Sequence, residues 1–145
     1  MTIFPVTAKS VTPPQDSPCL EYQVWLRSIG AVEVTTVLSP CLNFAPERGV
    51  RMAVSFDAEA PQILTIVPKD YRAGDGNRDW EETVKDSVRK VKTRHHIIKP
   101  GGHTFKVWMV DPGVAVQKIV VNTGGVRPSY LGPPESFRHS TSGKL

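Results

Sequence analysis

Residues 19–39, CLEYQVWLRSIGAVEVTTVLS, alternate apolar and polar side chains through two consecutive runs. Because successive side chains of a strand point to opposite faces, this alternation predicts half-buried strands over 19–28 and 31–39. Gly30 between the runs favours a tight connection, so we expect the two strands to pair as a hairpin. The first strand would direct Leu20, Tyr22, Val24 and Leu26 to one face and Glu21, Gln23, Trp25 and Arg27 to the other.

The same alternation returns over 50–57, 62–67, 103–110 and 116–122. The first two of these runs predict a second hairpin. A further strand near 2–11 would be confined to a sheet edge by its prolines. Connections this short favour antiparallel pairing, since parallel strands need longer crossovers. We therefore predict an all-β fold, a two-sheet antiparallel β-sandwich of the jelly-roll kind.

One helix is expected to interrupt the strands, over residues 79–92. Asn77 or Asp79 can cap its N-terminus, and Glu81 and Glu82 suit the positive end of a helix dipole. Apolar side chains recur at helical spacing at Trp80, Val84, Val88 and Val91. We expect this stripe to lie on one of the sheets, with Trp80 in the core.

The chain has 145 residues, of which 39% are hydrophobic, and this supports one domain with a core of its own. We place that domain at 1–138 and a flexible polar tail at 139–145. Apolar runs stay far below the roughly 18 residues of a membrane span, so no membrane partner is expected. The N-terminus lacks the features of a secretion signal, so the chain is either cytoplasmic or a piece of a longer precursor. Cys19 and Cys41 are either bridged or both free thiols.

The net charge of +4 is mild, and many of the cations fall within residues 85–94. A nucleic-acid interface would interleave such a cluster with aromatic side chains, which this one does not, so no nucleic-acid partner is expected. A solvated helix face is the simpler interpretation. A positive field would also attract the uronate groups of an acidic polysaccharide.

Catalytic chemistry finds little support in the sequence. Glycoside hydrolysis needs two facing carboxylates, but Asp57, Glu59, Asp111 and Glu135 fall in predicted turns, where acids usually bend or cap the chain. The motifs of serine, cysteine and zinc hydrolases are missing from the chain. We therefore expect this chain to be no enzyme and to need no cofactor.

The sequence gives equally little support for a metal site. His95 and His96 are adjacent, so a strand would point them to opposite faces, away from a shared ion. Asp75, Asn77 and Asp79 place oxygen-bearing side chains at alternate positions, which hints at a structural calcium ion. The segment lacks the glycine and the terminal glutamate of a complete calcium loop, and a turn followed by a helix cap explains the same residues.

Two tryptophans fall on strand faces that are otherwise polar. Trp25 accompanies Gln23 and Arg27, and Trp108 accompanies Thr104 and Lys106. An outward indole offers a flat ring on which the apolar face of a sugar can stack. Alternatively, the helix covers the sheet at this point and the two rings form its floor.

The Gly- and Pro-rich stretch 122–134 is a second candidate. Arg127 and Tyr130 could present a cation and a ring to a uronate-bearing glycan. The same stretch could instead wrap the edge of the sandwich or dock on a neighbouring domain.

Residues 106–136, KVWMVDPGVAVQKIVVNTGGVRPSYLGPPES, resemble the C-terminal domain of glycoside hydrolase family 115, the xylan α-glucuronidases. Upstream, SPCLEY, LSPCLNFAPERGVRMAVSFD, PQILTIVP and GNRDWEETV are similar to the same domain in the same order. The resemblance spans about residues 5–138.

This resemblance implies a sandwich similar to carbohydrate-binding modules. It also implies that catalysis belongs to a separate domain, so no catalytic residue of the family transfers to this chain. The expected ligand is xylan-type polysaccharide, glucuronoxylan in particular, and the expected setting is a secreted enzyme, extracellular or periplasmic, with its catalytic domain as partner. The alternative is a structural or dimerisation domain without a ligand of its own, in which the tryptophans anchor a protein interface.

Overall fold

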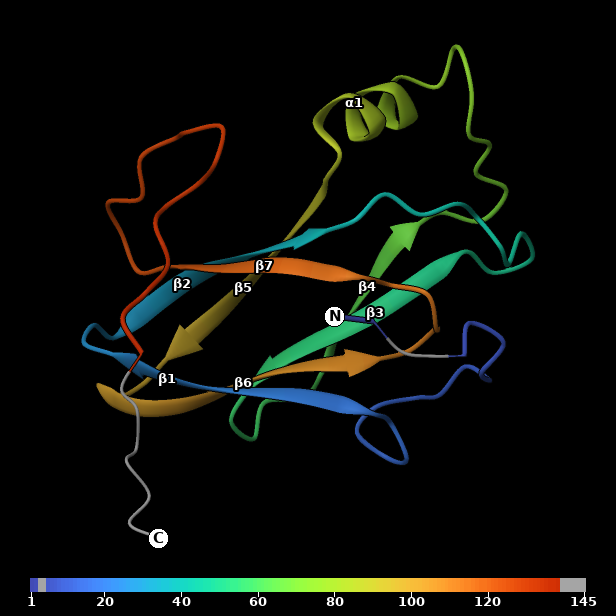
Figure 1. Ribbon diagram of the computed structural model, residues 1–145. Coiled ribbons are helices and arrows are strands. Elements are labelled where there is room, and N and C mark those ends of the chain that lie inside the picture. The colour runs from blue at the N-terminus through green and yellow to red at the C-terminus, as the bar shows by residue number, and fades with distance from the viewer. Residues whose placement is uncertain (3–4, 139–145) are drawn as a thin grey trace, which may run out of the picture.

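The structure is a computed structural model that describes residues 1–2 and 5–138, and the expected tail at 139–145 lies outside these residues. Two antiparallel sheets pack face to face (Figure 1). The four-stranded sheet has the order β1-β6-β3-β4 and the three-stranded sheet the order β5-β2-β7, which confirms the predicted β-sandwich. The elements are β1 (Cys19–Leu26), β2 (Gly30–Leu38), β3 (Val50–Phe56), β4 (Gln62–Val67), α1 (Arg78–Asp86), β5 (Arg89–Ile97), β6 (Gly101–Met109) and β7 (Val116–Asn122).

The core lies between the sheets and is built from alternate residues of the strands, as the sequence pattern predicts. Val34 of β2, Val54 of β3 and Phe105 of β6 are completely buried. Burying side chains of this size from both sheets supplies the main driving force for the sandwich. The buried cluster comprises Leu26, Val32, Val34, Leu38, Val50, Met52, Val54, Phe56, Ile66, Val67, Ile97, Phe105 and Val107.

The predicted hairpin of 19–28 with 31–39 is wrong, whereas the hairpin of β3 with β4 is confirmed. β1 pairs with β6, and β2 lies in the other sheet between β5 and β7. The connection at 27–29 therefore crosses from one sheet to the other. The alternation of apolar and polar residues predicts which face of a strand each side chain occupies, but not which other strand it pairs with. The same pattern therefore fits a hairpin and two consecutive strands in different sheets.

The segment before β1 forms no strand in residues 1–2 and 5–18, contrary to the expectation near 2–11. It is bonded instead to the end of β6. The Val11 N–H donates to the Val110 carbonyl, and the Ser17 hydroxyl donates to the Met109 carbonyl at 2.6 Å.

The predicted helix over 79–92 is too long, because α1 ends at Asp86 and 89–97 is strand β5. Ser87 adopts a left-handed conformation with φ of 56° and ends the helix, with its N–H donating to the Val84 carbonyl. After that point the burial alternates with a period of two, so the cations of β5 lie on a strand and not on a helix face.

The helix was expected to lie on one of the sheets, but it covers neither of them. Figure 1 shows α1 set apart from the strands, beyond the start of β5. Val84 is 46% exposed, and Trp80 is half-buried rather than part of the core. Neither of the two tryptophans on the strands therefore forms a floor beneath the helix. In the described residues, no helix has the length and apolarity to span a bilayer.

Candidate functional site

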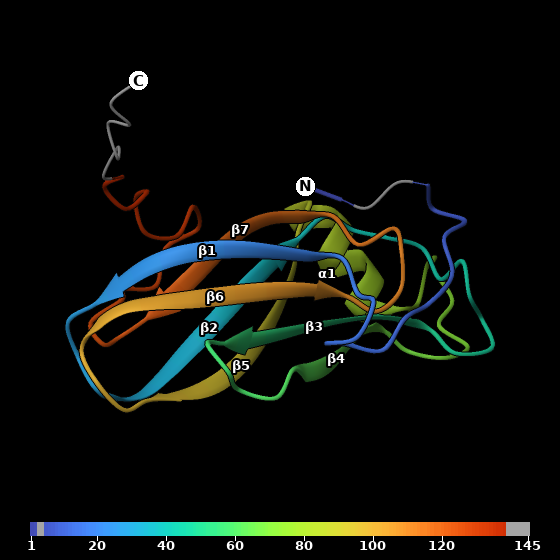
Figure 2. The same cartoon turned by 90° about the horizontal axis from the view of Figure 1, so that it is seen from below.

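The outer face of the four-stranded sheet is open over most of its area. In Figure 2, β1, β6, β3 and β4 lie side by side across the molecule with α1 behind them, and among the described residues only the loop before β1 crosses near one end. Both sequence-predicted tryptophans belong to this face, since Cys19 opposes Trp108 and Trp25 opposes Gly102 in the register of β1 with β6.

Trp25 is the most exposed tryptophan of the face, at 73%. Its cross-strand neighbour is Gly102, and a Cβ atom built on that glycine would lie 3.9 Å from Cε3 and Cζ3 of the indole. The six-membered part of the indole therefore lies against the space that a side chain at 102 would fill. Trp25 thus rests on the sheet and presents much of its ring surface to solvent.

Polar side chains follow Trp25 along the two strands. The Gln23 amide donates from Nε2 to Thr104 Oγ1 at 3.0 Å. Further along, Lys106 Nζ lies 3.7 Å from Glu21 Oε1. These amide, hydroxyl and charged groups can exchange hydrogen bonds with the hydroxyls of a sugar chain, because none of them is buried away from solvent.

Trp108 closes the row at its other end, six residues along β1 from Trp25, or about 20 Å at strand spacing. Its Nε1–H donates to Ser55 Oγ at 2.9 Å, and Lys106 Nζ lies 5.6 Å from the ring centroid. The ring is half-buried and already engaged by a cation, so it offers less free surface than Trp25.

The remaining predicted residues are placed differently. Arg27 is exposed just after β1, at the end of the face that carries Trp25. Arg127 and Tyr130 belong to the segment after β7, which is in the other sheet, and Lys118 Nζ holds this segment by donating to the Leu131 carbonyl at 2.7 Å. The structure thus gathers Trp25, Gln23 and Trp108 on one face and leaves Arg127 and Tyr130 outside it.

Asp111 has a role that the sequence interpretation missed. Its side chain is fully buried and accepts hydrogen bonds from Ser10 Oγ at 2.6 Å, Arg48 Nε at 3.1 Å and Arg51 Nε at 2.9 Å. Burial alone would raise the pKa of Asp111, but the hydrogen bonds from Arg51, Ser10 and Arg48 outweigh it and lower the pKa. The stretches FAPERGVR and WMVDPGV, which carry much of the family resemblance, therefore meet at a structural ion pair.

Two buried histidines pair with acids of the β3–β4 turn, which sequence analysis treated as ordinary turn acids. His103 Nδ1 lies 2.7 Å from Asp57 Oδ2, and this hydrogen bond raises the pKa of His103. His95 Nδ1 lies 2.6 Å from Glu59 Oε2, and its Nε2 lies 2.8 Å from Thr93 Oγ1.

Glu59, His95 and Thr93 are linked as an acid, a base and a hydroxyl nucleophile would be in a catalytic triad. Their burial excludes that chemistry. Thr93 is 6% exposed and His95 is 4% exposed, so a substrate cannot reach the hydroxyl. We assign these contacts to holding the β3–β4 turn. His96, the neighbour of His95, is exposed on the opposite face of β5, as the alternation predicts.

The calcium candidates do not converge. Asn77 Oδ1 accepts from the Trp80 N–H at 3.2 Å and caps α1, which is the role that the sequence favoured. Asp79 is bound by Arg89, with Nη2 at 2.6 Å from Oδ2, while Asp75 is exposed. Groups of three or more metal-ligating side chains do not occur in the part of the chain that the structure describes.

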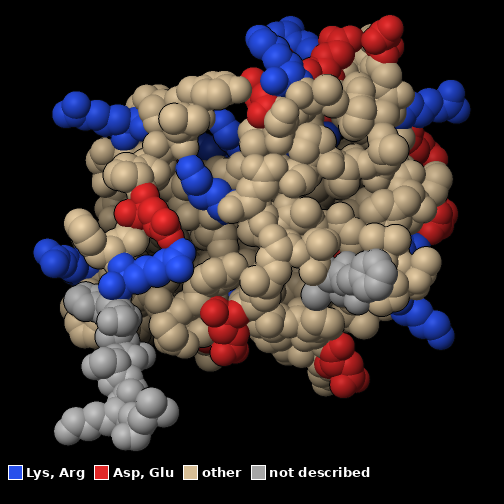
Figure 3. Space-filling model, in the orientation of Figure 1, with Lys and Arg blue, Asp and Glu red and all other residues tan. Residues whose placement is uncertain are grey.

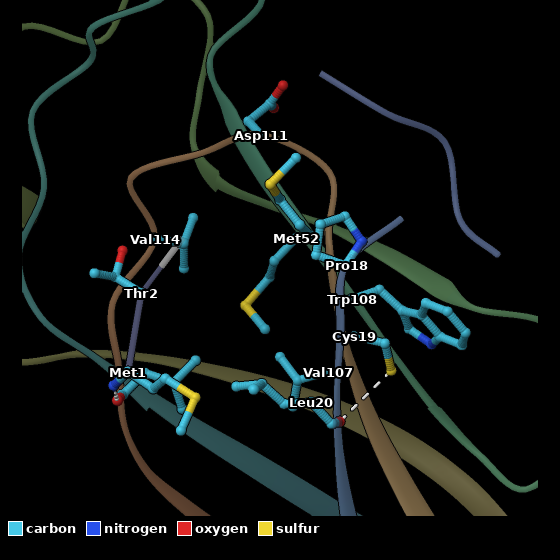
Figure 4. Close-up of a pocket in the computed structure, with 12 residues that line it drawn as sticks. Met1, Thr2, Pro18, Cys19, Leu20, Met52, Val107, Trp108, Asp111 and Val114 are labelled. Atoms are coloured by element: carbon cyan, nitrogen blue, oxygen red, sulfur yellow. Dashed lines mark hydrogen bonds between the residues drawn. The ribbon is translucent and has the colours of Figure 1, made fainter. Parts of the chain in front are cut away.

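A small apolar pocket of about 80 Å³ opens between the start of β1 and the start of β7. Figure 4 shows Met52 directed into it, with Leu20 and Val107 on one side and Val114 on another, while the Trp108 indole points away. Ligand pockets are usually several times larger and contain convergent polar groups. Cys19 lines this pocket as a free thiol, and Cys41 is free as well, so the two cysteines are not bridged.

Comparison with known proteins supports the resemblance. No curated protein gives a significant match. A solved family GH115 4-O-methyl-α-glucuronidase, with specificity for decorated arabinogalactans, has a similar fold at a TM-score of 0.63 and 19% identity. That match covers 74% of this chain and 13% of the other, so this chain corresponds to a small part of that enzyme. The model of the glycosyl hydrolase family 115 C-terminal domain matches residues 1–135, and the chain therefore belongs to this family of domains.

Proposed function

We propose that this domain is a non-catalytic carbohydrate-binding module that holds xylan-type polysaccharide, glucuronoxylan included, on the outer face of its four-stranded sheet. The observation that carries the proposal is Trp25, whose indole lies along the sheet over Gly102 and is 73% exposed. Large rings are costly to leave in water, and a flat exposed indole is suited to stacking on the C–H face of a pyranose.

The polymer would run along β1 and β6, because the polar groups that follow Trp25 are arranged in that direction. Gln23 and Thr104 come next along the face, and Arg27 lies beyond Trp25 at the other side. Each stacked ring contributes about 1 kcal/mol beyond area burial. A few such contacts correspond to dissociation constants in the micromolar to millimolar range.

The candidate catalytic acids support a binding role rather than a hydrolytic one. Asp57 and Glu59 are each engaged by a buried histidine, and Asp111 is enclosed by two guanidinium groups. We infer that hydrolysis belongs to the catalytic domain of a longer family 115 enzyme, outside the cytoplasm, and that this domain increases the time the enzyme spends on its polymer.

Affinity electrophoresis tests the proposal. Migration of the domain is compared in gels that contain glucuronoxylan, hydroxyethyl cellulose or no polymer. We expect retardation by glucuronoxylan, and loss of it in Trp25→Ala. Tyr130→Ala is the matched control, because Tyr130 is an exposed aromatic at 77% that lies outside the face. Unretarded migration of the wild type, or loss of retardation in the control alone, contradicts the proposal.

One observation favours the alternative of a structural or dimerisation domain. Ile29 and Ile98 flank the paired residues Gly30 and Ile97, at the end of the sandwich where β1 finishes, and they are 65% and 79% exposed. Together with Trp25 they form an apolar end that could anchor a protein interface. Sedimentation of the domain and acrylamide quenching of its tryptophan fluorescence distinguish the two functions. A tight dimer in which Trp25 is shielded from acrylamide supports only the alternative.

A further inference from the structure

His103 of β6 is a buried histidine whose two ring nitrogens both face hydrogen-bond acceptors. Nδ1 lies 2.7 Å from Asp57 Oδ2, and Nε2 lies 2.9 Å from the Lys99 carbonyl oxygen. A carboxylate and a carbonyl can only accept, so each ring nitrogen must carry a proton for both hydrogen bonds to form. The contacts therefore require the imidazolium form of His103, although its side chain is only 2% exposed.

The groups that touch His103 decide how firmly it holds this proton. The hydrogen bond to Asp57 raises the pKa of His103, and burial opposes that effect. The hydrogen bond to the Lys99 carbonyl raises the pKa as well, whereas the charge of the Lys99 ammonium lowers it. Val24, the residue opposite His103 on β1, is apolar and adds no charge. The pair with Asp57 is therefore the main reason that the imidazolium form is favoured.

The next titratable groups are a second histidine and its acid. Phe56 packs edge-on against both His103 and His95, with ring centroids 6.5 Å and 5.1 Å away, and His95 is paired with Glu59. Figure 3 shows Lys and Arg interspersed with Asp and Glu around the margin of the described molecule, rather than a broad area of one sign. Distant charges of mixed sign are weak and screened, so the near contacts control the protonation of His103.

Loss of the proton removes one of the two contacts. A neutral imidazole has a single N–H, and its hydrogen bond to the charged Asp57 is the stronger of the two. Nε2 then directs a lone pair at the Lys99 carbonyl oxygen, which repels it. The contact with Lys99 is therefore the one lost as the pH rises through the raised pKa of His103.

The Lys99 carbonyl anchors the bend that supports Trp25. The bend leads directly into Gly102, which pairs with Trp25 and leaves the space against which the indole lies. By holding a carbonyl four residues back in the chain, His103 closes the bend around Gly102. In Figure 1 the end of β1 and the start of β6 lie together at one end of the sandwich, where this contact acts.

The same carboxylate also positions the polar groups beside Trp25. Asp57 Oδ1 accepts a hydrogen bond from the Thr104 N–H at 2.8 Å, and Thr104 Oγ1 accepts one from Gln23 Nε2 at 3.0 Å. Asp57 is thus bonded through one oxygen to His103 and through the other to the row that follows Trp25.

We propose that Asp57 and His103 form a pH-dependent clamp on the outer face of the four-stranded sheet. With His103 protonated the clamp holds the bend beneath Trp25, and with His103 neutral it releases the bend. The effect on polysaccharide rests on the proposed function, whereas the clamp itself is a property of the free domain. The Trp25 surface is then ordered for its ligand at acidic pH and loosened as the pH rises.

Nuclear magnetic resonance of the isotope-labelled domain without ligand tests the clamp. The histidine rings, the Gly102 amide and the Trp25 indole N–H are followed from about pH 5 to about pH 9, which spans histidine titration. We expect the Gly102 and Trp25 resonances to change with the midpoint of His103 and not with that of His95. In Asp57→Asn, which loses the carboxylate, these midpoints should move together to lower pH.

Two variants separate His103 from the other histidines. His103→Gln removes the titration and keeps an amide that can donate, and His96→Gln is the matched control, because His96 is an exposed histidine of β5. The transition at Gly102 and Trp25 should vanish in the first variant and persist in the second. Absence of a transition in the wild type, a midpoint that follows His95, or a transition retained in His103→Gln overturns the proposal.

Calorimetry with xylohexaose, which has no group that titrates in this range, measures the consequence for binding. A ligand that needs the closed bend must restore one hydrogen bond, so we expect the dissociation constant to rise about fivefold through the His103 midpoint. A dissociation constant that does not change overturns the regulatory role. Resonances that follow His103 while xylohexaose binds at no pH support the clamp and contradict the proposed function, so the two failures are distinguishable.

Discussion

Replacing Asp111 by alanine should destabilise the domain by about 3 kcal/mol. Breaking a buried ion pair by removing one partner costs about 3–5 kcal/mol, because the other charge is left without compensation. Here the lower end applies, since Arg48 and Arg51 keep 36% and 34% of their side chains exposed and can be rehydrated. The substitution also leaves the Arg51 N–H without its acceptor, Asp111 Oδ2 at 2.9 Å.

Urea denaturation followed by circular dichroism measures this loss. With a slope of about 2 kcal/mol per molar urea, the midpoint of Asp111→Ala should fall by about 1.5 M. Asp75→Ala is the control, because Asp75 is an exposed loop acid and should change stability by no more than about 0.5 kcal/mol. A midpoint for Asp111→Ala as high as that of the control would refute the role of this carboxylate.

The stability that Asp111 provides through its contacts with Arg48 and Arg51 depends on pH. The pKa of Asp111 is lowered from its ordinary value of 3.8 in the folded state. The carboxylate therefore stabilises the fold above that pH, and this contribution is lost as the pH falls through the lowered pKa. The difference in stability between wild type and Asp111→Ala should accordingly be full at neutral pH and shrink on acidification.

Three further outcomes follow from the contacts. The hydrogen bond to Asp57 raises the pKa of His103 from 6.5. The protonated His103 therefore stabilises the fold below pH 6.5, and this stabilisation is lost as the pH rises through the raised pKa. Asp57→Asn should flatten this part of the dependence of melting temperature on pH. Gly49→Ala should lower the free energy of unfolding measured in urea by more than about 2 kcal/mol, because φ is +80° and the new Cβ would collide with the Val67 carbonyl oxygen. Trp108→Phe, which loses the indole hydrogen bond, should lower the free energy of unfolding by about 1 kcal/mol and keep polysaccharide binding.

The sheet character and the position of Trp25 could be predicted from the sequence because both depend on local alternation. Trp25 stands among Glu21, Gln23 and Arg27, and a strand with that pattern has one possible outer face. The same reasoning placed Trp108 on the outer face correctly but not its partial burial. That burial comes from Ser55 on β3, a neighbour that no local pattern identifies.

The helix boundary and the strand partners could not be predicted, for a related reason. Residues 85–94 carry cations at spacings that suit either a helix face or a strand, and the choice is decided by Ser87, whose left-handed backbone no simple rule indicates. Asp111 was misinterpreted because its partners, Ser10, Arg48 and Arg51, are 60 to 101 residues away in the chain. Contacts of this range depend on the finished fold.

Calorimetric titration of the domain with xylohexaose, in the wild type and in Trp25→Ala, tests whether the exposed indole binds the sugar chain. The side chain is only about a quarter buried, so the variant should fold with a loss of no more than about 1 kcal/mol. We expect a measurable heat of binding for the wild type and none for the folded variant. The same dissociation constant in both proteins would contradict it.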